Sequence, residues 1–167
     1  MKIFLKDALA TQDLGIILGQ TLKANTVILL EGDLGSGKTT LVQGLGKGLD
    51  IDEPIVSPTF TIINEYTQAR LPLYHLDLYR LETAEIIGLN LDTYWDGIEV
   101  VPGIVAIEWA QRMPYKPDAY IAIHLSNESE SQHLDEVNSV ARAAKIVPFN
   151  CTLDEKILAL SKEHNCS

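Results

Sequence analysis

A glycine-rich loop in the first quarter of the chain constrains what this sequence can fold into. Residues 31–40 read Glu-Gly-Asp-Leu-Gly-Ser-Gly-Lys-Thr-Thr, and Gly32 to Thr39 match the phosphate-binding pattern G-x-x-x-x-G-K-[ST]. The run at 26–30 before it is apolar and β-branched, as a buried strand should be, and residues 39–45 favour a helix start. A strand, a loop and a helix in this order direct backbone N–H groups and the positive end of the helix dipole at one anion. The context therefore predicts a nucleotide-phosphate site rather than a chance match on a glycine turn.

The residue types in this loop have distinct expected tasks. The ammonium group of Lys38 should reach the β- and γ-phosphates, and the hydroxyl of Thr39 should bind Mg²⁺. Gly35 and Gly37 lack a Cβ atom, so the backbone can approach the phosphates closely. The loop residues predicted to contact the nucleotide are Asp33, Leu34, Gly35, Ser36, Gly37, Lys38, Thr39 and Thr40.

A phosphate loop also needs a carboxylate that holds the metal or orders the attacking water, and two candidates lie at strand ends. Glu108 ends the apolar run 104–107, in the position of a Walker B acid although Asp is commoner there. Charged side chains are rarely buried unless they are paired, so an acid at the end of a buried strand is a candidate for a functional role. Asp77 would share one strand face with His75, but a surface aspartate paired to Arg80 is an equally good interpretation. His75 and Asp77 alone make a weak transition-metal site, because no third ligand is visible.

Three further residues are candidates for the site. Trp109 directly follows Glu108. A tryptophan usually fills the core, and the sharper interpretation makes it a wall of the nucleotide site. Thr59 and Thr61 flank Phe60 in a loop that either senses the γ-phosphate like a switch segment or is a plain turn with solvated hydroxyls.

The expected nucleotide follows from patterns that the sequence lacks. The guanine-specific pattern Asn-Lys-x-Asp is absent, so ATP is the default nucleotide. Small-molecule kinases usually bring several arginines in a lid, whereas the arginines of this chain are scattered between residues 70 and 142. This scatter counts against a kinase.

The rest of the chain predicts an α/β fold. Thr11 is a candidate N-cap for a first helix, and the alternate glycines at 44–48 indicate close packing of the helix after the loop. Runs at 61–66 and 73–79, joined by a short polar turn, predict an antiparallel hairpin and hence a mixed sheet. Further strands are expected at 104–109 and 119–125, an edge strand at 141–149, and a helix capped by Thr152 at 152–163.

Composition and charge limit the class of protein. Apolar residues make up 46% of the chain, which is typical of a globular protein, and the net charge of −10 argues against unassisted binding to nucleic acid or an anionic membrane. Residues 51–100 hold nine acidic and two basic side chains, so a face that docks a basic partner and a merely solvated surface both remain open. The sequence shows no signal peptide, no membrane-spanning run and no cysteine motif, so we expect a cytoplasmic protein.

With these motifs the chain resembles the bacterial TsaE family (older name YjeE), the ATPases of tRNA threonylcarbamoyladenosine biosynthesis. Residues 10–125 carry the resemblance, which rests on the loop at 32–40 together with Ser57-Pro-Thr-Phe-Thr61, Asn64-Glu-Tyr66, His75-Leu-Asp-Leu-Tyr-Arg80 and Ile107-Glu-Trp109. The resemblance implies one three-layer P-loop NTPase-like domain over 1–167, with a mixed, mostly parallel central sheet. It also implies ATP and Mg²⁺ as cofactors and two partner proteins, TsaB and TsaD.

Those partners transfer the threonylcarbamoyl group to adenosine 37 of tRNAs that read codons starting with A, and the ATP cycle of the family supports repeated turnover. The protein would therefore meet tRNA only indirectly, through the complex. By position, Thr39 and Glu108 would be the Mg²⁺ ligands. Asp77 and Lys38 would be the catalytic pair, with Asp77 positioning or activating water.

The resemblance implies four further assignments. Thr11 matches a threonine near the adenine, and Trp109 matches the site tryptophan of the family. Thr59 and Thr61 match its switch-like loop, and Arg142 matches an arginine that precedes the final strand. The sequence departs from the family after Leu125, where residues 126–140 form a longer polar segment that we expect to be a mobile loop.

Two other functions stay open at this point. A small-molecule kinase would use the same phosphate loop and transfer the phosphoryl group to a metabolite. A nucleotide-gated binding module would use the nucleotide state to control docking without productive hydrolysis.

Overall fold

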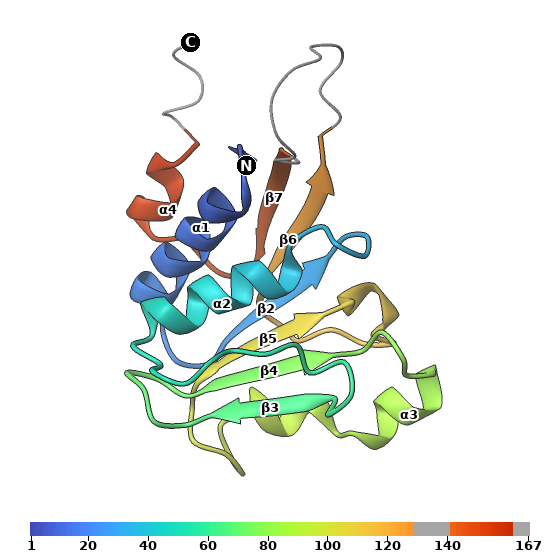
Figure 1. Cartoon of the computed structure of the whole chain (residues 1–167). Helices are drawn as coiled ribbons and strands as arrows, with labels where there is room; N and C mark the ends of the chain where they lie inside the picture. Colours follow the sequence, from blue (N-terminus) through green and yellow to red (C-terminus); the bar gives the residue numbers. More distant parts are fainter. Residues whose placement is uncertain (129–140, 162–167) are drawn as a thin grey trace.

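The computed structural model describes residues 1–128 and 141–161, which form a seven-stranded sheet covered by helices (Figure 1). The strands are β1 (Lys2–Leu5), β2 (Thr26–Glu31), β3 (Ile63–Tyr66), β4 (Leu73–Asp77), β5 (Ile104–Glu108), β6 (Tyr120–Asn127) and β7 (Arg142–Phe149). The helices are α1 (Ala8–Thr21), α2 (Lys38–Gly48), α3 (Thr83–Gly88) and α4 (Glu155–Ala159), with 3₁₀ turns η1 (Leu91–Tyr94) and η2 (Ala110–Arg112). Among the described residues, no helix has the length and apolar character needed to cross a membrane.

The centre of the sheet is parallel and its margins are antiparallel. The strand order is β1-β7-β6-β2-β5-β4-β3. β2 pairs in parallel with β5 and β6, and β5 with β4, whereas β3, β7 and β1 are added in antiparallel fashion. Strands β2 and β5 are covered on both faces, which explains their near-continuous apolar sequences. The three-layer α/β fold with a mixed sheet is confirmed, and β3 and β4 form the predicted hairpin.

Alternate side chains of the central strands enter two different cores. Ile28 and Leu30 of β2 lie in the core under α1 and α2, whereas Val27 and Leu29 lie in the core that contains Ile86 of α3. This division follows from the period of two in a strand, in which successive side chains face opposite sides. The sheet therefore lies between two layers, and α1, α2 and α4 share one of them (Figure 1).

Helices α1 and α2 approach each other until their backbones touch. A Cβ atom added to Gly44 of α2 would lie 2.0 Å from the carbonyl oxygen of Gln12, and one added to Gly15 of α1 would lie 2.2 Å from that of Leu41. Gly48 makes the same kind of contact with α1. Gly46, which lies between Gly44 and Gly48, packs instead against the side chain of Ile55 in the following loop. The prediction of close packing from these alternate glycines is confirmed.

The first helix begins earlier than the sequence predicted. Asp7, not Thr11, is the N-cap of α1, and its carboxylate accepts a hydrogen bond from the backbone N–H of Ala10 at 2.7 Å. Thr11 lies in the first turn, is completely buried and donates its hydroxyl to the carbonyl oxygen of Asp7. Both residue types are good N-caps, and capping at Asp7 adds a turn of helix before Thr11.

The end of the chain differs from expectation in three places. Strand β7 is not an edge strand, because β1 pairs with its outer side in antiparallel register. Helix α4 is capped by Asp154 instead of Thr152. Ser126 and Asn127 belong to β6, since pairing with β7 extends as far as Asn127 opposite Arg142. The remainder of the predicted polar loop, 129–140, lies outside the described residues.

The contact between α1 and α2 predicts a loss of stability when one of its glycines gains a side chain. Gly44→Ala should lower the free energy of unfolding by about 1–3 kcal/mol, because the new methyl group would overlap the backbone of α1. Gly88→Ala is the matched control, since it also lies in a helix but has open space around the added Cβ atom. Urea unfolding followed by circular dichroism compares the two, and equal stability of both variants would contradict the contact.

Candidate functional site

Most of the predicted site residues converge where the parallel strands end, whereas Thr11, Asp33, Ser36 and Thr61 do not line the cavity there. The phosphate loop follows β2, Asp77 ends β4 and Glu108 ends β5, and the register places Glu108 beside both Leu30 and Asp77. Ligands of open α/β sheets bind at the carboxyl ends of such strands. A cavity of about 250 Å³ lies there, lined by Leu34, Gly35, Gly37, Lys38, Thr39, Thr40, Ser57, Thr59, Asp77, Tyr79, Glu108, Trp109 and Arg142.

The loop leaves its anion-binding groups available. Gly35 and Gly37 have φ values of 78° and 101°, a left-handed conformation that favours glycine. Gly37 is the N-cap of α2 and supplies no side-chain cap, so no capping side chain occupies the first N–H groups of the helix. A phosphate at this position would accept hydrogen bonds from those N–H groups and lie at the positive end of the helix dipole.

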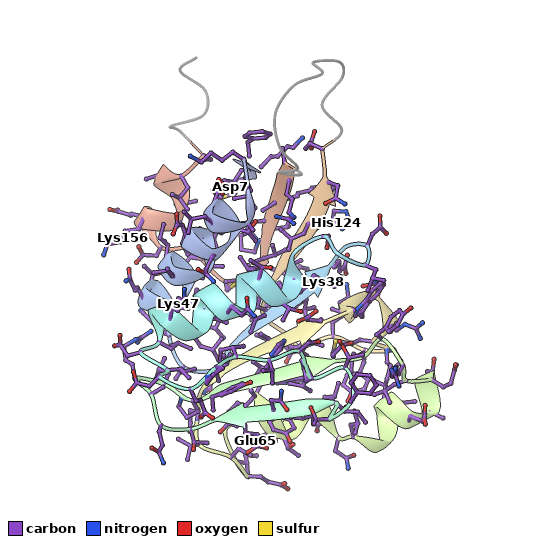
Figure 2. All side chains as sticks on the ribbon, in the orientation of Figure 1. Asp7, Lys38, Lys47, Glu65, His124 and Lys156 are labelled. Carbon is purple, nitrogen blue, oxygen red and sulfur yellow. The ribbon has the colours of Figure 1, made fainter. Side chains whose placement is uncertain are left out.

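Lys38 curls back over the loop. Its Nζ atom donates hydrogen bonds to the carbonyl oxygens of Gly32 and Asp33, each at 2.8 Å, and lies 4.2 Å from the centre of the Trp109 ring. Burial lowers the pKa of Lys38 from its ordinary value, and the nearby carboxylates of Glu108, Asp77 and Asp33 oppose this shift. Figure 2 shows Lys38 where the loop enters α2, at the opposite end of this helix from Lys47.

Glu108 joins three elements at one buried point. Its Oε1 atom accepts a hydrogen bond from Oγ1 of Thr39 on α2 at 2.9 Å and lies 2.9 Å from Nε2 of His75 on β4. Glu108 is 3% exposed. His75 therefore turns toward Glu108, and the described residues contain no group of three His, Cys, Asp or Glu that could hold a metal ion.

The donor set at Thr39 and Glu108 fits Mg²⁺. A hydroxyl oxygen and a carboxylate lie in hydrogen-bond contact beside the phosphate loop. Mg²⁺ prefers oxygen ligands and is usually bound by one or two carboxylates, with substrate phosphates and water completing its shell. One carboxylate and one hydroxyl are therefore enough protein ligands for such an ion when phosphates and water supply the others.

Asp77 is a buried, fixed carboxylate. Its Oδ2 atom accepts a hydrogen bond from Oγ1 of Thr59 at 2.7 Å, and its Oδ1 atom accepts one from the backbone N–H of Tyr79 at 2.8 Å. The residue is 4% exposed. Within the described residues Asp77 forms no ion pair with Arg80, whose guanidinium lies over the ring of Phe60 instead. The interpretation of Asp77 as a surface residue paired to Arg80 is therefore wrong.

The predicted switch-like loop is only partly brought to the cavity. Thr59 lines the cavity and its hydroxyl contacts both Asp77 and Ser57. Thr61 does not line the cavity, because its hydroxyl donates to Oδ1 of Asn64 at 2.7 Å in an exposed turn. Sequence spacing could not separate the two threonines, since both flank the same phenylalanine.

Two residues from distant parts of the chain border the loop at Gly37. A Cβ atom on Gly37 would lie 3.3 Å from Nε of Arg142 and 3.5 Å from Cγ2 of Thr11. Arg142 lines the cavity, and its Nε atom is buried without a hydrogen-bond partner among the described residues. A buried N–H donor without an acceptor is costly, so this atom is suited to a ligand oxygen. Thr11 borders the loop without lining the cavity. Like Nε of Arg142, the buried hydroxyl of Ser36 has no hydrogen-bond partner among the described residues.

Trp109 forms a wall of the cavity and packs against the core beneath it. Its backbone has φ of 60°, so the chain turns sharply as β5 ends. The ring of Tyr79 packs against it with a centroid distance of 4.7 Å. Sequence reasoning missed Tyr79 and Ser57 as cavity residues, although both lie within motifs that had been singled out.

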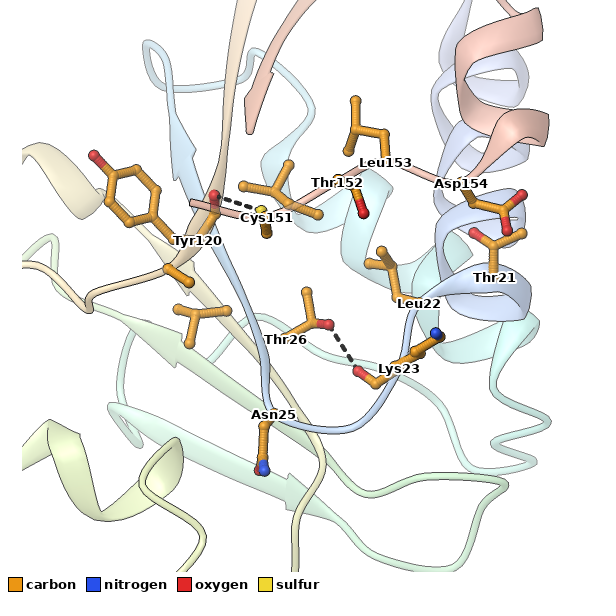
Figure 3. A pocket seen from close by; sticks show the side chains of 13 residues that line it. Thr21, Leu22, Lys23, Asn25, Thr26, Tyr120, Cys151, Thr152, Leu153 and Asp154 are labelled. Carbon is orange, nitrogen blue, oxygen red and sulfur yellow. Dashed lines mark hydrogen bonds between the residues drawn. The ribbon is translucent and has the colours of Figure 1, made fainter. Parts of the chain in front are cut away.

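A larger cavity lies at the other end of the strands. It has a volume of about 390 Å³ and is lined by the end of α1, the starts of β2 and β6, and residues 151–154 (Figure 3). Its thiol, Cys151, donates to the carbonyl oxygen of Tyr120. The glycine-rich loop does not contribute to this cavity, so the larger cavity is separate from the predicted site residues.

A comparison with protein families is decisive for the relationship of this chain. Residues 5–135 match the family described as "Threonylcarbamoyl adenosine biosynthesis protein TsaE". The chain belongs to the TsaE family. The expected resemblance is thereby confirmed.

Individual relatives agree with this membership. A protein of Nostoc sp. (strain PCC 7120), named tRNA threonylcarbamoyladenosine biosynthesis protein TsaE, is 64% identical over 93% of this chain and 91% of its own length. A TsaE protein of Synechocystis sp. is 56% identical over 70% of this chain and 74% of its own. The crystal structure of YdiB from Bacillus subtilis superposes with a TM-score of 0.69 at 27% identity, covering 99% of this chain and 93% of that one.

The burial of Lys38 should be visible in the pH dependence of stability. Because the pKa of Lys38 is lowered on folding, the unfolded chain binds more protons between that lowered pKa and the ordinary value of 10.5. The free energy of unfolding of the wild type should therefore rise with alkaline pH relative to that of Lys38→Met, which has no ammonium group. Urea unfolding of both proteins from neutral pH toward 10.5 measures this difference, and a constant or falling difference would contradict the assignment.

Proposed function

We propose that this protein is the Mg²⁺-dependent ATPase subunit of a cytoplasmic tRNA-modifying assembly. It would bind and hydrolyse ATP while TsaB and TsaD form threonylcarbamoyladenosine at position 37 of tRNAs that read codons starting with A. The names of its relatives supply the link to tRNA threonylcarbamoyladenosine biosynthesis. The activity, the cofactors and the partners rest on the site and on the family resemblance.

One observation carries the proposal: the hydrogen bond between Thr39 and Glu108. It joins the threonine of the phosphate loop to the carboxylate at the end of the neighbouring strand, and these are the two positions that hold Mg²⁺ in P-loop NTPases. When bound there, Mg²⁺ would neutralise charge on the β- and γ-phosphates. Lys38 and the N–H groups at the start of α2 would bind the same phosphates.

Asp77 is suited to orient the attacking water. Both of its oxygens already accept a hydrogen bond, from Thr59 and from the backbone of Tyr79, so its carboxylate plane is fixed. Each carboxylate oxygen can accept a further hydrogen bond, which a water molecule in the cavity would donate. Trp109 and Tyr79 form an aromatic wall of the same cavity.

The positions of the arginines favour an ATPase over a small-molecule kinase. Arg70 donates to the backbone carbonyls that end α1, Arg80 stacks on Phe60 and Arg112 donates to the carbonyl of Leu81. All arginines of this chain lie in its described part, and Arg142 alone lines the cavity. A lid of arginines over an acceptor site is therefore not formed by these residues.

Charge and exposure support a role within a complex. With a net charge of −10 the protein is poorly suited to bind tRNA by itself. Leu34 and Phe60 are 76% and 80% exposed, and they lie on the two loops that border the cavity. These two side chains are accessible to a partner protein that approaches the mouth of the cavity.

Lys38→Ala tests whether the loop drives repeated turnover. In a reconstituted reaction with TsaB, TsaD, tRNA and ATP, we expect the variant to lower multi-turnover modification about 100-fold or more, since phosphate-binding charge is lost. Lys47→Ala is the matched control, because Lys47 lies on the same helix but is exposed and contacts Gln12. Unchanged multi-turnover modification by Lys38→Ala would rule out the proposed role of the loop.

Asp77→Asn separates hydrolysis from a nucleotide gate. The substitution keeps the shape of the side chain but removes the charge that orients water, so ATP hydrolysis should fall by about 10²–10⁴-fold. ATP binding and assembly with TsaB and TsaD should persist, which calorimetry and gel filtration can measure. Loss of assembly with an unchanged hydrolysis rate would show that Asp77 acts in docking and not on water, and it would favour a nucleotide-gated binding module whose hydrolysis is not productive.

A further inference from the structure

His75 is a buried polar residue that the nucleotide cavity does not include. It lies in the middle of β4, is 0% exposed and does not line the cavity. Its Nε2 atom lies 2.9 Å from Oε1 of Glu108 on the neighbouring strand. An imidazole in an apolar core is costly unless it is hydrogen-bonded, so this contact accounts for its presence there.

The register of two parallel strands brings this pair together. His75 lies beside Ala106, and Asp77 lies beside Glu108. Because residues two apart in a strand face the same side, all of these side chains share one face of the sheet, which is the face covered by α2. Because the side chain of Ala106 is only a methyl group, the imidazole of His75 can extend past it and contact Glu108.

The hydrogen-bond pattern assigns the proton of the imidazole. An ionised carboxylate only accepts hydrogen bonds, so Nε2 of His75 carries the hydrogen that it donates to Glu108. The Nδ1 atom is buried and has no partner among the described residues. The only side-chain hydrogen bond of His75 among the described residues is therefore the one from Nε2 to Glu108.

We propose that His75 is a positioning residue for the Mg²⁺ site, an inference that rests on the proposed ATPase function. It holds the Glu108 carboxylate in the orientation in which Thr39 also contacts it. Both donors use Oε1, and among the described residues none donates to Oε2, so this second oxygen stays available to a cation.

The test compares variants that keep or lose the donor. His75→Leu removes it, whereas His75→Gln retains an amide N–H at a similar distance from Cβ. Tyr74→Phe is the matched control, because it deletes one hydrogen bond, to the carbonyl of Val101, from a buried residue of the same strand. For each protein the affinity for a fluorescent non-hydrolysable ATP analogue is measured in EDTA and then as Mg²⁺ is added.

We expect His75→Leu to need about 10- to 100-fold more Mg²⁺ for half of its effect on analogue affinity, the size found when partners of metal ligands are removed. Its affinity in EDTA should equal that of the wild type. His75→Gln should recover most of the loss, and Tyr74→Phe should match the wild type. In hydrolysis, the Mg²⁺ requirement should shift in the same order.

The outcomes separate this inference from the function on which it rests. A wild-type protein that binds the analogue identically with and without Mg²⁺ would overturn the proposed function itself. A Mg²⁺-responsive wild type with an unchanged response in folded His75→Leu would overturn the inference alone, and so would an equal shift in Tyr74→Phe. If His75→Leu does not fold, His75→Asn replaces it, because its shorter amide does not reach Glu108; equal Mg²⁺ responses of the Asn and Gln variants would then overturn the inference.

Discussion

A single buried oxygen, Oε1 of Glu108, connects the elements on which the site depends. It accepts the hydroxyl of Thr39 from α2 and faces the imidazole of His75 from β4, while its own residue ends β5. An ionised group at this depth is costly unless hydrogen bonds and opposite charge compensate for it. The opposite charge comes from Lys38, whose lowered pKa shows that burial outweighs the pull of the carboxylates. Burial and the neighbouring carboxylates thus act on Lys38 in opposite directions.

The contact with α1 fixes the position of α2. Backbone touches backbone at Gly44 and Gly15, so α2 cannot shift along α1 without a clash. The same contact places Thr11 beside Gly37, while β7 brings Arg142 to the same glycine. The residues around the phosphate loop therefore come from opposite ends of the chain, and the loop depends on the whole sheet for its surroundings. The surroundings of this short motif are therefore set by residues that are far from it in sequence.

The sequence predicted those parts of the fold and site that depend on local pattern. The phosphate loop, the strand before it and the carboxylates of Asp77 and Glu108 could be recognised because strand ends and glycine spacing are visible in the chain itself. What could not be predicted depends on register between strands. His75 reaches Glu108 only because β4 and β5 pair with His75 beside Ala106. The two threonines of the 57–61 loop have different surroundings because Thr61 donates its hydrogen bond to Asn64 and Thr59 donates to Asp77.

The same limit explains the errors at the ends of the sheet. Strand β7 lies near the end of the chain, and its neighbour β1 lies more than a hundred residues away in sequence, so local pattern alone could not add the outer strand. The cap of α1 was misplaced for a different reason. Asp7 and Thr11 are both good capping residues one turn apart, and the choice between them depends on where the helix packs, since Thr11 is completely buried in the fold.

The lengths of the two acidic side chains account for their different surroundings. Asp77 and Glu108 lie side by side on adjacent strands, where two like charges repel each other. The shorter Asp77 stays close to its own backbone, bound by the N–H of Tyr79 and the hydroxyl of Thr59. Glu108 has one more methylene group and reaches across to α2, where Thr39 meets it. Aspartate at position 108 would hold its carboxylate nearer to its own strand and to Asp77. The glutamate at this position thus brings its carboxylate to Thr39, whereas the carboxylate of Asp77 stays with Thr59.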